Sequence, residues 1–227
     1  MDKLKLASYL DLANHHSDAT WTDIEKVCEE VKKYHFNAAF MNPCYVAAVK
    51  AKYEGVKIGT VVAFPLGQET RDVKIISCLA AAKAGADELD IQMNVGFFKA
   101  KKYKEVAEEM SAIVESAKSY RSNIIIKFII ETGFLTDVEI KKASEMVLES
   151  RADFVKTCSG MGPRGAEVND VNLIKEAIGD KIRIKVAGGV VTYEQAISFI
   201  EAGAVRIGTS KAVEIVEEIK QIRKSNI

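Results

Sequence analysis

Short apolar, β-branched runs alternate with longer amphipathic segments along the whole chain. The short runs have the length of strands, and the longer segments have the apolar period of helices. Repeated strand–helix units predict parallel strands joined by right-handed crossovers. Because eight such units are the number at which a parallel sheet closes on itself, we predict an α/β fold, a (β/α)8 TIM barrel. The eight candidate strands are Ala7–Leu12, Ala38–Met41, Lys57–Phe64, Glu88–Met93, Ile124–Glu131, Phe154–Cys158, Ile182–Ala187 and Val205–Gly208.

The predicted helices have recognisable ends. Thr20, Thr136 and Thr192 each precede acidic or amide residues, as helix N-caps do. Gly85 and Gly203 stand where helices end in a left-handed residue, directly before a strand. No linker rich in Pro, Ser or Gly divides the chain, so we expect residues 1–227 to form one barrel domain. An open doubly wound sheet is the alternative, although no GxGxxG turn supports it.

Composition excludes several classes of protein. Hydrophobic residues make up 48% of the chain and charged residues 28%, which is typical of a globular protein. Lys and Arg (32) balance Asp and Glu (32), so we expect no nucleic-acid partner and no polybasic membrane contact. No apolar stretch approaches the length of a membrane span, and the first residues do not resemble a signal peptide.

The thiols and histidines suggest no metal site. Cys28, Cys44, Cys78 and Cys158 form no CxxC pair, and only three histidines are present. We therefore expect reduced cysteines, a cytoplasmic location and no metal or other cofactor.

Alternate residues of a barrel strand point into the barrel. By this rule the interior holds Asp90, Lys127, Lys156 and Lys185, which lie on four successive predicted strands. Buried lysines are costly unless they are paired or neutral. One interpretation is a structural network of ion pairs with Asp90 and Glu131.

The other interpretation is catalytic. Lys156 and Lys185 lie near the ends of neighbouring strands, which run about 4.8 Å apart. Two ammonium groups at that range disfavour each other's charge, and burial adds to the effect. A lysine pKa lowered from about 10.4 to roughly 7–8 would supply an amine nucleophile at neutral pH. This pair therefore indicates attack of a lysine on a carbonyl group.

Glycines cluster directly after the last three predicted strands. Ser159 and Gly160 begin one such loop, Gly188-Gly189 form the second, and Gly208-Thr209-Ser210 form the third. Glycine lets backbone amides approach an anion, and barrels often bind phosphate at the loops after strands seven and eight. We therefore predict a phosphate site beside the lysine pair.

These residues resemble the deoxyribose-phosphate aldolase family over most of the chain, from about Asp11 to Ser210. Seven short motifs occur in the family's order. They are Asn42-Pro43-Cys44-Tyr45-Val46, Phe64-Pro65-Leu66-Gly67, Gly85-Ala86-Asp87-Glu88-Leu89-Asp90, Ile130-Glu131-Thr132, Asp153-Phe154-Val155-Lys156-Thr157, Lys185-Val186-Ala187-Gly188-Gly189-Val190 and Arg206-Ile207-Gly208-Thr209-Ser210.

The resemblance implies a metal-independent lyase that reversibly cleaves 2-deoxy-D-ribose 5-phosphate into D-glyceraldehyde 3-phosphate and acetaldehyde. It assigns the Schiff base to Lys156, the lysine that keeps it deprotonated to Lys185, and acid–base chemistry to Asp90. It also places Asp11 and Lys127 in the polar network of the site. The implied phosphate contacts are Ser159, Gly160, Gly188, Gly189, Gly208 and Ser210. Family members are commonly oligomers, so a homodimer or homotetramer is expected.

The chain also departs from the family's pattern. Ala13 stands where a threonine is frequent, followed by Asn14, His15 and His16, and Met161 and Lys211 replace other residues in the phosphate loops. Arg164 and Lys211 are candidates to compensate at the phosphate, unless they are simply solvated. Some members end in a tyrosine, whereas the last tyrosine here is Tyr193. Two alternatives follow: a barrel aldolase with a shifted substrate, and a catalytically silent barrel that binds a sugar phosphate.

Overall fold

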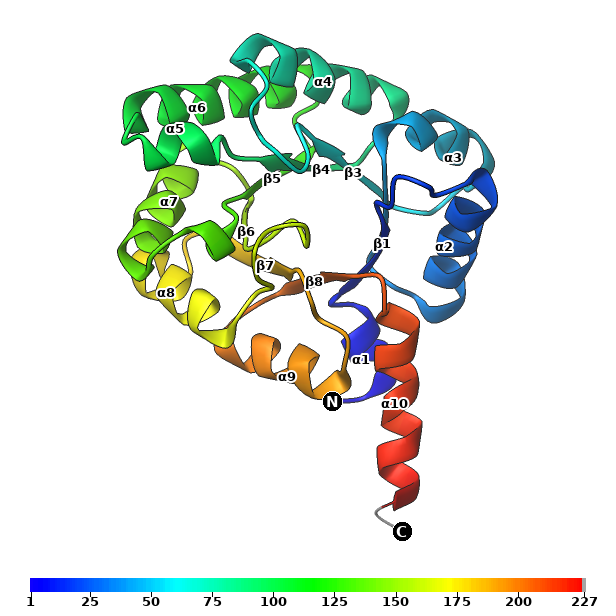
Figure 1. Ribbon diagram of the computed structural model, residues 1–227. Helices are drawn as coiled ribbons and strands as arrows, with labels where there is room; N and C mark the ends of the chain where they lie inside the picture. Colours follow the sequence, from blue (N-terminus) through cyan, green and yellow to red (C-terminus); the bar gives the residue numbers. More distant parts are fainter. Residues whose placement is uncertain (226–227) are drawn as a thin grey trace.

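Eight parallel strands form a closed barrel in the order of the chain, and the last strand pairs with the first. The computed structural model describes the backbone of residues 1–225 and the side chains of residues 1–219. Viewed along the barrel, the strands form an inner ring and the helices an outer one (Figure 1). The predicted TIM barrel is thus confirmed. Its strands are β1 (Leu10–Asn14), β2 (Ala38–Met41), β3 (Ile58–Val62), β4 (Glu88–Gln92), β5 (Ile125–Ile129), β6 (Phe154–Lys156), β7 (Arg183–Ala187) and β8 (Arg206–Thr209).

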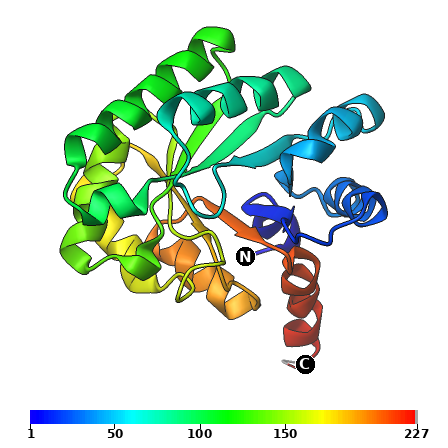
Figure 2. The same cartoon turned by 45° about the horizontal axis from the view of Figure 1, so that its top comes forward.

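The helices follow the strands around the barrel, and the first helix of the chain contacts the last helix (Figure 2). Within the described residues, none of them is long and apolar enough to cross a membrane. They are α1 (Lys3–Ala7), α2 (Trp21–Tyr34), α3 (Val46–Lys52), α4 (Arg71–Ala84), α5 (Val95–Lys99), α6 (Tyr103–Tyr120), α7 (Asp137–Glu149), α8 (Val168–Ile178), α9 (Tyr193–Ala202) and α10 (Ala212–Ser225), with short 3-10 turns at Pro43–Tyr45 and Thr132–Phe134.

The predicted helix ends are present. Thr20, Thr136 and Thr192 each accept the backbone N–H of the third helical residue, whose side chain in turn accepts the N–H of the threonine. Gly85 and Gly203 end α4 and α9 with φ of 107° and 119°, a conformation that favours glycine. These signals fix where each helix begins and where the chain turns back into the barrel.

The predicted bounds of the first strand are wrong. Residues Lys3–Ala7 form α1, and Asp2 caps this helix by accepting the N–H of Lys5. The apolar residues before Tyr9 therefore pack as a helical turn, and β1 begins only at Leu10. Elsewhere the strands mostly end earlier than predicted; β3, for example, ends at Val62, before Ala63 takes a positive φ of 53°.

The two faces of the sheet differ in character. On β4, Leu89 and Ile91 belong to the apolar core between sheet and helices, whereas Glu88 and Asp90 are buried inside the barrel. The ring of Phe40 also lies inside, and a Cβ added to Gly59 would come within 2.2 Å of it. The barrel interior is therefore a polar compartment with aromatic walls, and its charged residues need one another as partners.

Candidate active site

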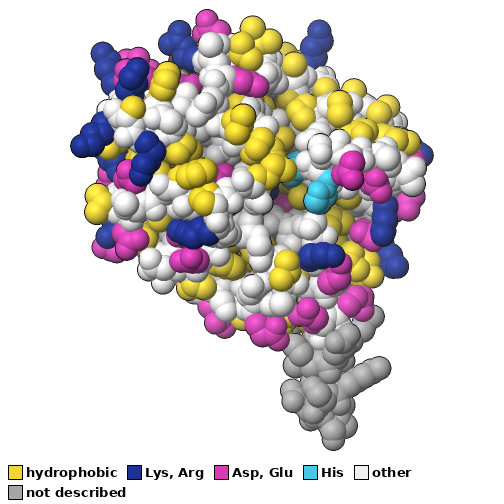
Figure 3. Space-filling model, in the orientation of Figure 1, with side chains coloured by type: hydrophobic (Ala, Val, Ile, Leu, Met, Phe, Trp, Pro, Cys, Tyr) yellow, Lys and Arg dark blue, Asp and Glu magenta, His cyan; other side chains and the backbone are white. Residues whose placement is uncertain are grey.

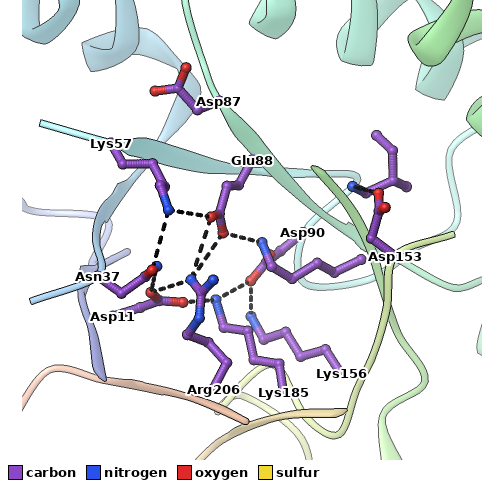
Figure 4. A network of polar contacts seen from close by, with 12 residues as sticks. Asp11, Asn37, Lys57, Asp87, Glu88, Asp90, Asp153, Lys156, Lys185 and Arg206 are labelled. Atoms are coloured by element: carbon purple, nitrogen blue, oxygen red, sulfur yellow. Dashed lines mark hydrogen bonds and ion pairs between the residues drawn. The ribbon is translucent and has the colours of Figure 1, made fainter. Parts of the chain in front are cut away.

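The Asp90 carboxylate lies at the centre of a buried network of charges (Figure 4). Its Oδ2 atom accepts hydrogen bonds from Lys156 Nζ at 2.8 Å and from Lys185 Nζ at 2.9 Å. Its Oδ1 atom lies 3.0 Å from Lys127 Nζ. The strand register explains this convergence, because Asp90 is level with Lys127 on β5 and Lys156 is level with Lys185 on β7.

Further carboxylates hold the cations in place. Asp11 on β1 lies 2.8 Å from Lys185 Nζ and 2.9 Å from Arg206 Nη1. Glu88 accepts a hydrogen bond from Lys127 Nζ at 2.6 Å and forms an ion pair with Arg206 Nη1 at 3.4 Å. Because Arg206 is on β8 and Glu88 on β4, these contacts span the barrel and tie opposite strands together.

The charges in this network do not cancel. Four buried basic side chains, Lys127, Lys156, Lys185 and Arg206, share three acidic ones, Asp11, Glu88 and Asp90. All seven are at most 7% exposed. The exposed Lys57 adds a fifth cation, 3.8 Å from Glu88. An uncompensated buried charge is costly, so a neutral form of one lysine is favoured in this cluster.

The pKa shifts in the network follow from burial and charge. Burial tends to raise the pKa of Asp90, but Lys127, Lys156 and Lys185 outweigh it and hold that pKa well below its usual range. Burial tends to lower the pKa of Lys127, but Asp90 and Glu88 overcome it and raise that pKa. For Lys185, burial and the charges of the two neighbouring lysines outweigh the attraction of the nearby carboxylates, and the pKa is lowered. Lys185 therefore releases a proton more readily than Lys127 does.

The lysines differ in their access to solvent. A cavity of about 270 Å³ opens at the carboxyl ends of the strands, where the surface is hollowed at the centre of the molecule (Figure 3). Asp90, Lys156 and Lys185 line this cavity, whereas Lys127 does not. The Lys156 side chain is 4% exposed, compared with 1% for Lys185. Lys156 is thus the amine most accessible to a small molecule in the cavity.

Neighbouring residues leave room for the Lys185 side chain. Its Nζ lies 3.5 Å from the centre of the Phe40 ring, a cation–π contact. On the next strand, a Cβ at Gly208 would come within 3.1 Å of Lys185 Cε. The ring and the glycine together direct the amine toward Asp90.

The glycine-rich loops meet around the same cavity. Gly188 has a φ of 95°, and a Cβ there would approach Cys158 Cβ to 2.9 Å, so the turn requires glycine. Glu131 accepts the backbone N–H of Ser159 and so fixes the start of the loop after β6. The predicted phosphate contacts all line the cavity: Ser159, Gly160, Gly188, Gly189, Gly208 and Ser210.

The remaining sequence candidates lie elsewhere. Asp11 and Lys127 are beneath the cavity, in contact with the network but not in its lining. Arg164 makes two hydrogen bonds of 2.8 Å to Asp170, and Lys211 lies 2.9 Å from Glu214. Neither of these two cations lines the cavity, so the expectation that they compensate at the phosphate is not supported by their positions.

Sequence reasoning assigned one member of the network wrongly. Among the described residues, Glu131 has no basic partner within 4 Å; it accepts hydrogen bonds from Ser159 and from Gln92 Nε2. Glu88 forms the ion pairs that were expected of Glu131. Glu88 and Arg206 were visible as polar residues in family-like motifs, but nothing in the sequence showed that they meet across the barrel. The lining also includes His15, which the sequence marked only as a departure from the family.

Comparison with known proteins places this site in a family. The model of the DeoC/LacD family aldolases matches residues 5–212. The chain belongs to this family. A deoxyribose-phosphate aldolase of Carboxydothermus hydrogenoformans is 41% identical over 215 residues, covering 94% of each chain. One from Thermococcus kodakarensis is 43% identical over 221 residues, covering 96% of this chain and 98% of the relative.

Solved structures agree with this assignment. An aldolase named QR15 superposes with a TM-score of 0.89 at 37% identity, covering 95% of this chain and 96% of the other. The deoxyribose phosphate aldolase of Aeropyrum pernix, described as a tetramer, gives a TM-score of 0.90 at 30% identity, covering 97% and 93%. Within the described part of the chain, no group of three or more His, Cys, Asp or Glu is arranged to hold a metal ion.

Proposed function

We propose that this chain reversibly cleaves 2-deoxy-D-ribose 5-phosphate into D-glyceraldehyde 3-phosphate and acetaldehyde through a Schiff base on Lys156. One observation carries the proposal: Lys156 and Lys185 share a single Asp90 oxygen in a cavity ringed by glycine-rich loops. Family membership and the names of the relatives support the substrate.

Each group has a defined part in the reaction. The neutral amine of Lys156 adds to C1 of the open-chain sugar and, with uptake of one proton, loses water to give an iminium ion; the final hydrolysis releases this proton again. The iminium draws electrons from the C2–C3 bond, which breaks and leaves an enamine of two carbons. The C3–C4 bond is one carbon too distant to be activated in this way. C3 becomes the aldehyde carbon of glyceraldehyde 3-phosphate.

The C3 hydroxyl must lose its proton as the bond breaks. Asp90 receives it through a water and, because its pKa is held low, readily gives it up again. The same path returns a proton to C2 of the enamine. Water then hydrolyses the iminium, releases acetaldehyde and restores Lys156.

The phosphate is held at the opposite end of the substrate. Backbone amides at Gly160, Gly188 and Gly189 lie on turns with positive φ and line the cavity, as does the start of the loop after β8. Anchoring at the phosphate places C1 over Lys156, which is how binding energy remote from the reaction lowers its barrier.

A product assay tests the proposal. Purified protein is incubated with 2-deoxy-D-ribose 5-phosphate, and released acetaldehyde is measured by coupled reduction with alcohol dehydrogenase and NADH. We expect turnover by the natural chain and none above background by Lys156→Ala. A folded protein that binds the sugar phosphate but releases no acetaldehyde would instead support a silent barrel. Assembly as a homodimer or homotetramer remains a prediction, which analytical ultracentrifugation checks.

A further inference from the structure

His15 has a position in the cavity that the proposed chemistry does not use. It follows β1 directly and lines the cavity together with Asp90 and Lys156. Asp11, Ala13 and His15 alternate along the chain, so they share the inward face at rising heights. Asp11 lies at the level of the charge network, and the small side chain of Ala13 separates it from the imidazole above.

The imidazole is held by rings but has spare hydrogen-bonding capacity. Its centre lies 5.3 Å from that of Phe64 and 6.4 Å from that of Phe40. The Asn42 side chain interacts with the ring as a hydrogen-bond partner. The Nδ1 atom, however, is buried and has no hydrogen-bond partner among the described residues. Buried polar atoms rarely remain unpaired, so a bound molecule or water is expected to complete the hydrogen bonds of this ring.

The ring is uncharged at working pH. Burial, followed by the charge of Lys156, lowers the pKa of His15 to about 3. A neutral imidazole has one N–H donor and one acceptor nitrogen, which suits a hydroxyl group, whereas it gives no charge to attract a phosphate.

The position of His15 along the barrel axis determines which part of the substrate it can contact. The centre of its ring lies 6.4 Å from that of Phe40, which in turn lies 3.5 Å from Lys185 Nζ, so the imidazole is at most about 10 Å from this amine. The amines of Lys156 and Lys185 are level with the lower layer, because Lys185 Nζ contacts Asp11 directly. The imidazole therefore reaches the substrate between the reacting carbons below and the phosphate loops at the mouth. The open-chain sugar has two hydroxyl groups. The proton transfer places the C3 hydroxyl at Asp90, so the C4 hydroxyl is the one that His15 can contact.

We propose that His15 is a substrate-positioning residue, whose imidazole hydrogen bonds the C4 hydroxyl of the sugar phosphate, the hydroxyl beside the aldehyde of glyceraldehyde 3-phosphate. The inference rests on the proposed function. It makes the enzyme selective for acceptor aldehydes that carry a hydroxyl next to the carbonyl. The departure from the family's pattern at this segment thereby acquires a specific chemical role.

The test compares two acceptors in the direction of synthesis, with acetaldehyde as the donor. One acceptor is D-glyceraldehyde 3-phosphate and the other is 3-phosphonooxypropanal, which lacks only the hydroxyl in question. We expect His15→Leu to lower kcat/KM for glyceraldehyde 3-phosphate by about 3- to 10-fold, the range for one lost hydrogen bond. For the analogue the change is expected to be less than about twofold, and His15→Gln, which keeps a donor and an acceptor, is expected to recover part of the loss.

Two controls separate positioning from structural damage. Exchange of the acetaldehyde methyl protons in D2O, followed by NMR, requires the Lys156 enamine but no acceptor, so His15→Leu should leave its rate unchanged. Asp18→Asn, at an exposed position of the same loop that does not line the cavity, should leave the ratio of the two acceptors unchanged. Equal losses on both acceptors, or slower exchange in His15→Leu, would overturn the assignment. Absence of exchange in the natural chain would overturn the proposed function itself, and this inference with it.

Discussion

Replacing Lys185 with methionine isolates the electrostatic effect of one lysine on the other. Lys156 Nζ and Lys185 Nζ contact the same Asp90 oxygen at 2.8 and 2.9 Å, so the two nitrogens are at most about 5.7 Å apart. At an effective dielectric constant of 20, two unit charges at that separation repel each other by about 3 kcal/mol. This energy corresponds to about 2 pH units. Methionine keeps a similar length without the charge.

The expected result is a shift of the pH–rate profile for imine formation. Without Lys185, protonated Lys156 loses its repulsive neighbour and keeps Asp90 as a partner. Imine formation, which needs an uncharged amine, should then be slower at neutral pH, and the profile should move to higher pH by about 2 units. The rate is measured as proton exchange of acetaldehyde in D2O between pH 5 and 10, which does not depend on the acceptor.

Lys127→Met is the matched control for this shift. Lys127 also contacts Asp90, but at the other oxygen and outside the cavity lining. Its removal should move the profile less than the removal of Lys185. An unchanged profile in Lys185→Met, or a shift to lower pH, would refute the electrostatic reasoning.

Three other perturbations test separate parts of the structure. Asp90→Asn should lower kcat by about 10²–10⁴-fold while borohydride still traps an imine, since the proton relay is lost but the amine remains; loss of trapping together with turnover would contradict the relay. Gly59→Ala should destabilise the fold by about 1–3 kcal/mol in urea titrations, because the new Cβ would come within 2.2 Å of the Phe40 ring; an unchanged midpoint would count against a rigid interior. Lys127 and Arg206 outweigh burial and lower the pKa of Glu88 to about 2, so this carboxylate stabilises the fold above its unfolded pKa of about 4.5, and the contribution is lost as pH falls toward 2. The urea midpoint of the natural chain should fall as pH is lowered through that window, and that of Glu88→Gln should fall less steeply. An equal dependence of the two midpoints on pH would contradict this assignment.

The fold could be predicted largely from local signals. Strand–helix alternation, threonine caps and the glycines that end helices are properties of short segments, and they determined the barrel and the approximate position of each strand. The first strand was predicted to begin three residues too early because Ala7 is apolar and suits either a strand or the end of a helical turn. Only the cap at Asp2 distinguishes the two, and it precedes the apolar residues.

The site was predictable where it depends on strand period, and not where it depends on contacts across the barrel. Alternation alone placed Asp90, Lys127, Lys156 and Lys185 in the interior. The pairing of Arg206 with Asp11 and Glu88 depends on the closure and register of the barrel, which no local pattern encodes. His15 was missed as a lining residue because it follows the strand, where the direction of the chain is set by packing against Phe40 and Phe64.

The central claim, that Lys156 forms a Schiff base with a sugar phosphate, is tested most directly by borohydride trapping. The natural chain, Lys156→Ala and Lys127→Met are incubated with 2-deoxy-D-ribose 5-phosphate, reduced, and examined by intact mass and peptide mapping. We expect a covalent adduct at Lys156 in the natural chain and in Lys127→Met, and none in Lys156→Ala. An adduct at Lys185 would reverse the roles of the two lysines, and the absence of any adduct on the folded protein would contradict the aldolase mechanism.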